Sequence, residues 1–172
     1  MDTVDILEPA TTPPPSRPTE QDTPLLAFAL TTELTIRDLY DQAIGSGSFD
    51  ETTTVTMTAI RDSHGAYSQS LSALLGRVAP TSPDTDLFDK LKGDVTGDTT
   101  ALANALAQIE NVAVATHTKL VSSLLGIEGA ALLASILIVE ARHATVLQTL
   151  GGATSLADQL VGDADPLVPP AN

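Results

Sequence analysis

The chain has 172 residues, a length that suits one domain with terminal tails. Hydrophobic residues make up 42% and aromatic residues 3%, so the core must consist of Leu, Ala, Val and Ile, which favours packed helices over a sandwich or barrel. The 22 acidic residues against 8 basic ones give a net charge of −14, which excludes nucleic acid and anionic membrane surfaces as expected partners. The absence of cysteine excludes disulfides, iron–sulfur clusters and thiol catalysis.

The N-terminal segment, residues 1–23, is acidic and rich in proline, and we expect it to form a disordered tail. It lacks the basic-then-apolar order of a signal peptide. The most apolar run, residues 129–139, is about 11 residues long, whereas about 20 are needed to cross a bilayer. The sequence therefore predicts a cytoplasmic protein with no membrane contact. The acidic tail is a candidate docking segment for a protein partner, and the chain is a candidate homo-oligomer.

Periodic apolar stripes at spacings of three and four predict four long helices. In chain order these helices cover residues 24–44, 50–78, 98–125 and 127–150. Thr23 is the expected cap of the first helix, and Pro24 suits its first position. Residues 79–97 form a polar connection, with a short helical turn near residues 86–91.

The lengths of the connections predict the topology. The first two helices are joined by a short turn, and so are the last two, so each pair should form an antiparallel hairpin. The middle connection of about 19 residues can reach about 60 Å, whereas a helix of about 25 residues is about 38 Å long. We therefore expect an all-α four-helix bundle over residues 24–150, in which a long crossover leaves the second and third helices parallel. Residues 151–172 form a C-terminal tail with a short helix near residues 155–161.

Several polar residues interrupt the apolar stripes. Residues at equal distances from a hairpin turn lie side by side, which places Glu33 near His64 and Glu110 beside His143. Buried carboxylates cost several kcal/mol each unless they are paired. Only Arg37 lies on the same stripes, so a divalent cation is the expected partner of the remaining carboxylates. The candidate metal ligands are Glu33, His64, Glu110, Glu140 and His143, with Tyr67 as a further candidate.

The Glu-x-x-His pair of the fourth helix lies in the segment Val-Glu-Ala-Arg-His at residues 139–143. In its four-helix context this segment resembles the ferritin-like superfamily, and more narrowly the bacterial ferritin-like domain proteins, over about residues 24–150 and weakly at residues 165–167. The resemblance implies iron or another divalent transition metal held by Glu on the first and third helices and by Glu-x-x-His on the second and fourth. Glu33, Glu110, Glu140 and His143 match this pattern residue by residue.

The second helix departs from the family pattern. Either residues 61–64 (Arg-Asp-Ser-His) or residues 64–67 (His-Gly-Ala-Tyr) occupy the motif, and the core stripe favours the second alternative because residues 64 and 67 both face inward. Both alternatives lack a bridging carboxylate, and three carboxylates cannot neutralise two ferrous ions. The pattern therefore indicates a reduced site, with iron, manganese or zinc as its metal. A single ion held by Glu110, Glu140, His143 and either His64 or Glu33 suits it.

Structural roles compete with metal binding at these positions. Glu33 can pair with Arg37 one turn later. His64 and Tyr67 can form a hydrogen-bonded pair in a retired site. The sequence therefore supports two functions. One is a metal-binding ferritin-like protein, and the other is a non-catalytic bundle that binds a protein partner or a small ligand.

Two further polar residues of the stripes are expected to be structural. We expect His117, two turns after Glu110, to be a half-buried core histidine rather than a ligand. We expect Tyr40 to pack in the core with its hydroxyl at the end of the bundle. Neither residue belongs to the predicted site.

Overall fold

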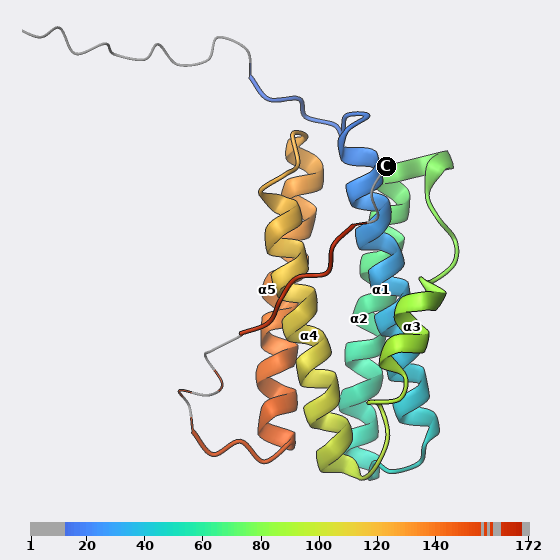
Figure 1. Ribbon diagram of the computed structural model, residues 1–172, viewed down its shortest axis with the longest axis vertical. Helices are drawn as coiled ribbons and strands as arrows, with labels where there is room; N and C mark the ends of the chain where they lie inside the picture. Colours follow the sequence, from blue (N-terminus) through green and yellow to red (C-terminus); the bar gives the residue numbers. More distant parts are fainter. Residues whose placement is uncertain (1–12, 156, 158, 160–162, 170–172) are drawn as a thin grey trace, which may run out of the picture.

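Four long helices form the body of the protein, and a computed structural model describes residues 13–155, 157, 159 and 163–169. The described elements are α1 (Asp22–Gly45), α2 (Glu51–Leu75), the short 3₁₀ helix η1 (Gly76–Val78), α3 (Thr85–Leu91), α4 (Thr99–Val121) and α5 (Ile127–Leu150). All of the regular structure in the described ranges is helical, so the predicted all-α class is confirmed (Figure 1). The short helix predicted near residues 155–161 falls mostly outside the described residues.

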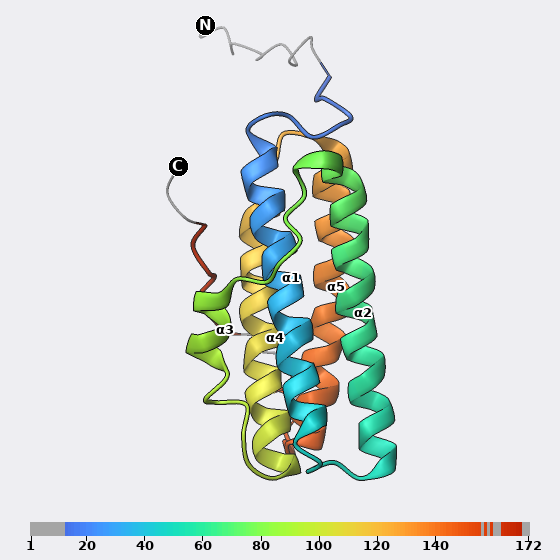
Figure 2. The ribbon, with the colours of Figure 1, turned by 90° about the vertical axis from the view of Figure 1, so that its right-hand side faces the viewer.

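The helices pair as two antiparallel hairpins. α1 packs along α2 and α4 along α5, while α1 also contacts α4 and α2 contacts α5. The connection from Leu75 to Thr99 runs the length of the bundle and carries α3 along its side (Figure 2). Because the connection returns to the starting end, α2 and α4 run in the same direction, and the predicted long crossover is confirmed.

Aspartate caps define where three of the helices begin. Asp50, Asp84 and Asp98 each accept a hydrogen bond from the backbone amide three residues later, at 2.7, 3.0 and 2.9 Å. Such caps satisfy amides that have no partner within the helix. At the other end, α2 stops before Gly76, whose φ of 62° suits glycine, so the helix is three residues shorter than the stripe predicted.

The first helix begins at Asp22 rather than after the predicted cap, Thr23. The buried Asp22 carboxylate accepts hydrogen bonds from the backbone amides of Thr19, Leu125 and Gly126, at 2.7, 2.8 and 2.9 Å. Burial raises the pKa of the Asp22 carboxyl, but these hydrogen bonds outweigh it and hold the pKa below its usual value. Asp22 thus ties the start of α1 to the turn between α4 and α5.

Part of the N-terminal segment expected to be disordered is packed on the bundle. The first two amides of α5 donate to the carbonyl oxygens of Pro15 and Ser16, both at 2.9 Å. A Cβ atom added to Gly126 would lie 2.6 Å from the carbonyl oxygen of Arg17, so this contact requires glycine. The segment supplies acceptors that the start of α5 needs. Residues 1–12 of the predicted tail lie outside the described residues.

The core consists of two apolar clusters with a layer of polar side chains between them. One cluster includes Leu39, Met57, Leu106 and Leu147, and the other includes Leu26, Leu71, Leu133 and Ile136. We call the residues between them the polar layer: Glu33, Tyr40, His64, Glu110, His117, Glu140 and His143. The two clusters hold the four helices together above and below this layer, which fixes the backbone positions from which its side chains project.

The last long helix, α5, is the most apolar. It is the only helix in the described ranges whose length and composition would let it cross a membrane, and 33% of its most apolar stretch is buried. One such helix is weak evidence, because core helices of soluble proteins meet the same criterion. Here α5 contributes Leu133, Ile136 and Leu147 to the core and Glu140 to the polar layer. Its outer face exposes Ile138 and Val146.

Replacing Asp22 by alanine should destabilise the protein by about 2–4 kcal/mol, because three backbone amides at the end of the bundle lose a charged acceptor. The matched control is Asp50→Ala, which removes an exposed cap and should cost about 1 kcal/mol. Urea denaturation followed by circular dichroism measures both values. Equal losses in the two variants would show that Asp22 does not tie the ends of the helices together.

Candidate metal centre

All four long helices contribute to the polar layer. Three carboxylates and two imidazoles are completely buried, and the third imidazole, that of His143, is 11% exposed. The donors are Glu33 from α1, His64 from α2, Glu110 and His117 from α4, and Glu140 and His143 from α5. The layer therefore gathers nitrogen and oxygen ligands in a space from which water is excluded.

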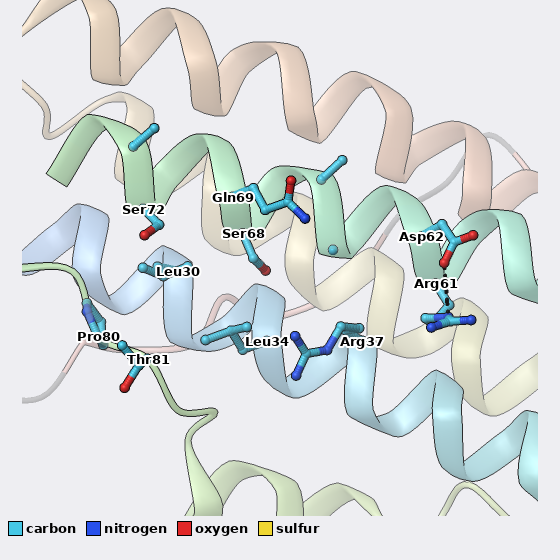
Figure 3. Close-up of a pocket in the computed structure, with 13 residues that line it drawn as sticks. Leu30, Leu34, Arg37, Arg61, Asp62, Ser68, Gln69, Ser72, Pro80 and Thr81 are labelled. Atoms are coloured by element: carbon cyan, nitrogen blue, oxygen red, sulfur yellow. Dashed lines mark ion pairs between the residues drawn. The ribbon is translucent and has the colours of Figure 1, made fainter. Parts of the chain in front are cut away.

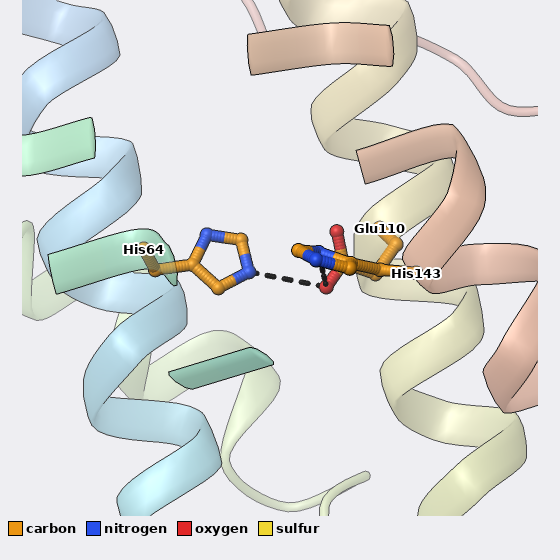
Figure 4. A group of neighbouring side chains, drawn as sticks. All are labelled: His64, Glu110 and His143. Carbon is orange, nitrogen blue, oxygen red and sulfur yellow. Dashed lines mark hydrogen bonds and ion pairs between the residues drawn. The ribbon is translucent and has the colours of Figure 1, made fainter. Parts of the chain in front are cut away.

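His64 lies at the centre of the layer and contacts both hairpins. Its Nδ1 atom is 2.7 Å from Glu33 Oε2, and its Nε2 atom is 3.1 Å from Glu110 Oε1. Figure 4 shows His64 reaching from α2 toward Glu110 and His143 on the opposite hairpin. His143 Nδ1 lies 3.5 Å from Glu110 Oε1. The structure thus brings Glu110 and His143 to one level, as their distances from the hairpin turn predict.

His117 belongs to this cluster, which corrects the expectation of a half-buried core residue. The side chain is fully buried, with Nδ1 2.9 Å from Glu140 Oε2 and Nε2 3.5 Å from Glu33 Oε1. The spacing of seven residues between Glu110 and His117 indicated that both lie on the same face of the helix, because two helical turns return a residue to that face. The expectation failed because Glu140 lies one turn along α5 from His143 and so reaches the level of His117.

Tyr40 also departs from its expected role. Its hydroxyl donates a hydrogen bond of 2.6 Å to Glu110 Oε1 within the polar layer, rather than lying at the end of the bundle. Its ring stacks on His64, with centroids 5.4 Å apart and an angle of 28° between the rings. Tyr40 therefore positions both a carboxylate and an imidazole, although the apolar stripe alone indicated only packing.

The alternative in which Glu33 pairs with Arg37 is not formed. Arg37 instead pairs with Asp38 at 2.6 Å, while Glu33 contacts His64. A half-buried arginine on the stripe can turn its guanidinium toward solvent, whereas the shorter Glu33 side chain cannot. Histidines, and not Arg37, are therefore the ion-pair partners of the buried carboxylates.

The second helix matches the alternative that begins at His64. Arg61 lies at the edge of the bundle, 3.2 Å from Asp62 and 3.6 Å from Asp41, and takes no part in the polar layer. Tyr67 is half-buried and meets the His64 ring edge-on, with centroids 5.8 Å apart, rather than forming the hydrogen-bonded pair of the alternative in which the site is retired. Imidazole thus occupies the inward position of α2 in the polar layer.

The surroundings of Glu110 and Glu140 shift the pKa values of these two carboxyls in opposite directions. Burial raises the pKa of Glu140 to about 8, and the proximity of His117 opposes this only in part. Burial also raises the pKa of Glu110, but the neighbouring His64 outweighs it and lowers this pKa to about 2. Burial lowers the pKa of His64, yet Glu110 and Glu33 together hold it well above its usual value. Protons on His64 and Glu140 therefore help to neutralise the layer at pH 7.

Several buried atoms of the layer lack a partner, which tests whether the residues fit a metal ion. Within the described residues, five such atoms of the layer have no hydrogen bond: Glu33 Oε1, Glu110 Oε2, Glu140 Oε1, His117 Nε2 and His143 Nδ1. Two sets of ligand atoms lie within 4.8 Å of one another, namely those of His64, Glu110 and His143 and those of Glu33, His64 and Glu140. Unsatisfied buried polar atoms are costly, and each of these can bind a transition metal. The residues fit such an ion.

A separate groove of about 820 Å³ lies outside the polar layer, between α1 and α2 (Figure 3). Leu30 and Leu34 line one side of it, and Arg37 and Arg61 lie along it. No residue of the polar layer lines this groove, so the groove does not open onto the buried ligands.

The metal-free protein should lose stability as the pH rises from about 5 to about 8. Glu140 has a folded-state pKa of about 8 against an ordinary 4.5, so its contribution is complete below pH 4.5 and is lost as the pH rises through 8. His64, also raised, acts in the same direction above its ordinary 6.5, whereas the lowered pKa of Glu110 costs stability only below 4.5. The loss should amount to a few kcal/mol.

Urea denaturation across this pH range, with a chelator present, measures the effect. Glu140→Gln is the matched control, because an amide of the same shape does not titrate and should flatten the profile. Identical profiles for the two proteins would show that Glu140 is not the group responsible.

Comparison with known families agrees with this architecture. The model of the ferritin-like domain family matches residues 21–153, which include all of the long helices. A search of curated proteins gave no match, and a search of solved structures gave none either. The family match covers far more than half of the chain and every residue of the polar layer. The chain therefore belongs to the ferritin-like domain family.

Proposed function

We propose that the protein binds a divalent transition metal in the polar layer. The observation that carries the proposal is the convergence of three buried carboxylates and three imidazoles with five buried atoms that have no hydrogen-bond partner. Helix backbones from both hairpins hold these groups, so forming the site requires little rearrangement. The ligands would be Glu33, His64, Glu110, Glu140 and His143, together with His117.

The chemistry of the donor atoms narrows the choice of metal. Mixed imidazole and carboxylate ligands suit iron, manganese and zinc, and copper binds such sites still more strongly. Calcium and magnesium prefer sets made of oxygen alone. A bound ion would place positive charge among Glu33, Glu110 and Glu140, in place of the protons that neutralise them in its absence. The protein would then hold its metal more tightly as the pH rises.

Glu140→Ala should remove the ion that Glu140 helps to bind, because Glu140 belongs to one of the two sets of clustered ligands. Elemental analysis of the purified, untagged protein should find one or two ions per chain before or after incubation with ferrous iron under air. The variant should bind this ion at least about tenfold more weakly than the wild-type protein does. Glu128→Ala, which removes an exposed carboxylate from the same helix, is the matched control and should keep the wild-type content. No metal above background in the folded wild-type protein would overturn the proposal.

A second candidate function is a bundle with a retired metal site that binds a small apolar ligand. A cavity of about 410 Å³, which is within the size range of ligand pockets, lies between α1, α3 and α4. Residues 165–167 close it on one side. Its wall includes Ile36, Leu87, Ile109 and Leu167. The backbone amide of Leu167 donates to Thr116 Oγ1 at 2.9 Å, which holds the closing segment in place.

Glu140→Leu distinguishes the two functions. If the site is retired, an apolar side chain of similar size removes a buried polar group and should be neutral or stabilising by about 1–4 kcal/mol. If the site binds metal, the variant should lose the stabilisation that wild type gains from added metal. Thermal unfolding with and without ferrous iron measures both effects.

The expectations about self-association, a protein partner for residues 1–23 and a cytoplasmic location stay predictions. The exposed apolar residues Ile127, Ile138 and Val146 along α5 support a contact with another protein surface, including a second copy of this chain. The net charge of −14 continues to argue against nucleic acid.

A further inference from the structure

The two ring nitrogens of His64 face different groups of ligands. Nδ1 points to Glu33 at 2.7 Å, and Nε2 points to Glu110 at 3.1 Å. The ring is completely buried, so neither nitrogen contacts bulk water. In Figure 4 the Nε2 side of the ring faces Glu110 and His143, while Nδ1 is turned away from them. His64 therefore separates two potential binding positions rather than belonging to one.

Each position has its own set of donors. On the Nε2 side, ligand atoms of Glu110 and His143 lie within 4.8 Å of each other and of His64. On the other side, Glu33 and Glu140 form a second such set with His64. His117 adjoins this second set, at 2.9 Å from Glu140 and 3.5 Å from Glu33. The two sets have His64 as their only shared member.

The charges of the layer explain why a bridging imidazole suits two ions. Two divalent ions bring four positive charges, whereas Glu33, Glu110 and Glu140 supply three negative ones. An imidazole that binds a metal through both nitrogens carries no N–H proton and supplies the fourth negative charge. Starting from the protonated His64 ring, two N–H bonds break, two metal–nitrogen bonds form, and both protons pass to solvent, with no change in oxidation state. The charge that the missing carboxylate would have supplied is thereby restored.

We propose that His64 is a bridging ligand that holds two divalent ions, one at each ring nitrogen. The first ion is bound by Glu33, Glu140 and His117, and the second by Glu110 and His143. This inference rests on the proposed metal binding and specifies its form. It also replaces the expectation of a single ion, which assumed that only carboxylates could balance a pair.

The bridge predicts a characteristic separation of the ions. Metal–nitrogen bonds of about 2.0–2.1 Å on both sides of an imidazole ring place the ions about 6 Å apart. Two-metal sites of the usual kind have separations of about 3.5–4 Å. Stacking on Tyr40 and the edge contact with Tyr67 fix the plane of the ring, which keeps both nitrogens directed at their ligands.

Copper loading of the full chain tests the bridge. Cu²⁺ is a suitable probe because it binds nitrogen and oxygen sites most strongly and has one unpaired electron. After a chelator wash that removes ions from surface carboxylates, elemental analysis gives the copper content and electron paramagnetic resonance gives the spin count. We expect two Cu²⁺ per chain, with an integrated low-temperature signal well below two spins, because an imidazole anion couples the two electrons.

The other outcomes separate the two proposals. Two Cu²⁺ with two full, uncoupled spins, or ions about 3.5–4 Å apart by anomalous X-ray diffraction, would overturn the bridge. One Cu²⁺ per chain that is lost in Glu140→Ala would also overturn the bridge but leave metal binding intact. No bound copper in the folded protein would overturn both.

Two variants test the role of the ring itself. His64→Glu supplies a carboxylate in place of the imidazole and should keep two Cu²⁺ while shortening their separation to about 3.5–4 Å. His143→Gln removes a ligand from one position only. It should weaken the binding of the second ion by about tenfold or more. The first ion should then give a full, uncoupled electron paramagnetic resonance signal. A His64→Glu spectrum identical to that of wild type would show that His64 does not join the ions.

Discussion

The burial of three carboxylates between two apolar clusters is the constraint on which the centre of this protein depends. Glu33, Glu110 and Glu140 are completely shielded from water, and no lysine or arginine in the described ranges pairs with them. Their compensation comes from His64 and His117 and from the Tyr40 hydroxyl. Because carboxylates come from both hairpins, the side chains that satisfy them also join the hairpins across the bundle.

The polar layer makes the protein responsive to what occupies it. Protons on His64 and Glu140 balance the layer in the absence of metal, and a cation can replace them because its charge serves the same carboxylates. The apolar clusters on either side keep water out and hold the backbone fixed. Metal binding, proton release and stability are therefore linked properties of one group of side chains.

On α2 the chain departs from the Glu-x-x-His pattern that the resemblance to ferritin-like proteins implies, with His64 and Tyr67 in its place. An imidazole takes the inward position of a carboxylate, and Arg61, which could have neutralised the layer, lies at the bundle edge with Asp41 and Asp62. The exchange removes one negative charge but adds a ligand with two donor atoms on opposite sides of a ring. For the same reason, the loss of a carboxylate does not by itself mean that the site has been lost.

The sequence by itself determined the helices, the crossover and the level at which Glu110 meets His143, because apolar period and connection length act locally along the chain. It also placed all seven members of the layer on inward-facing stripes and identified five of them as candidate ligands. The roles of Tyr40 and His117 and the partner of Glu33 were decided only by tertiary structure. They depend on which helices are neighbours across the bundle and on side-chain directions, and the pattern of a single helix carries neither.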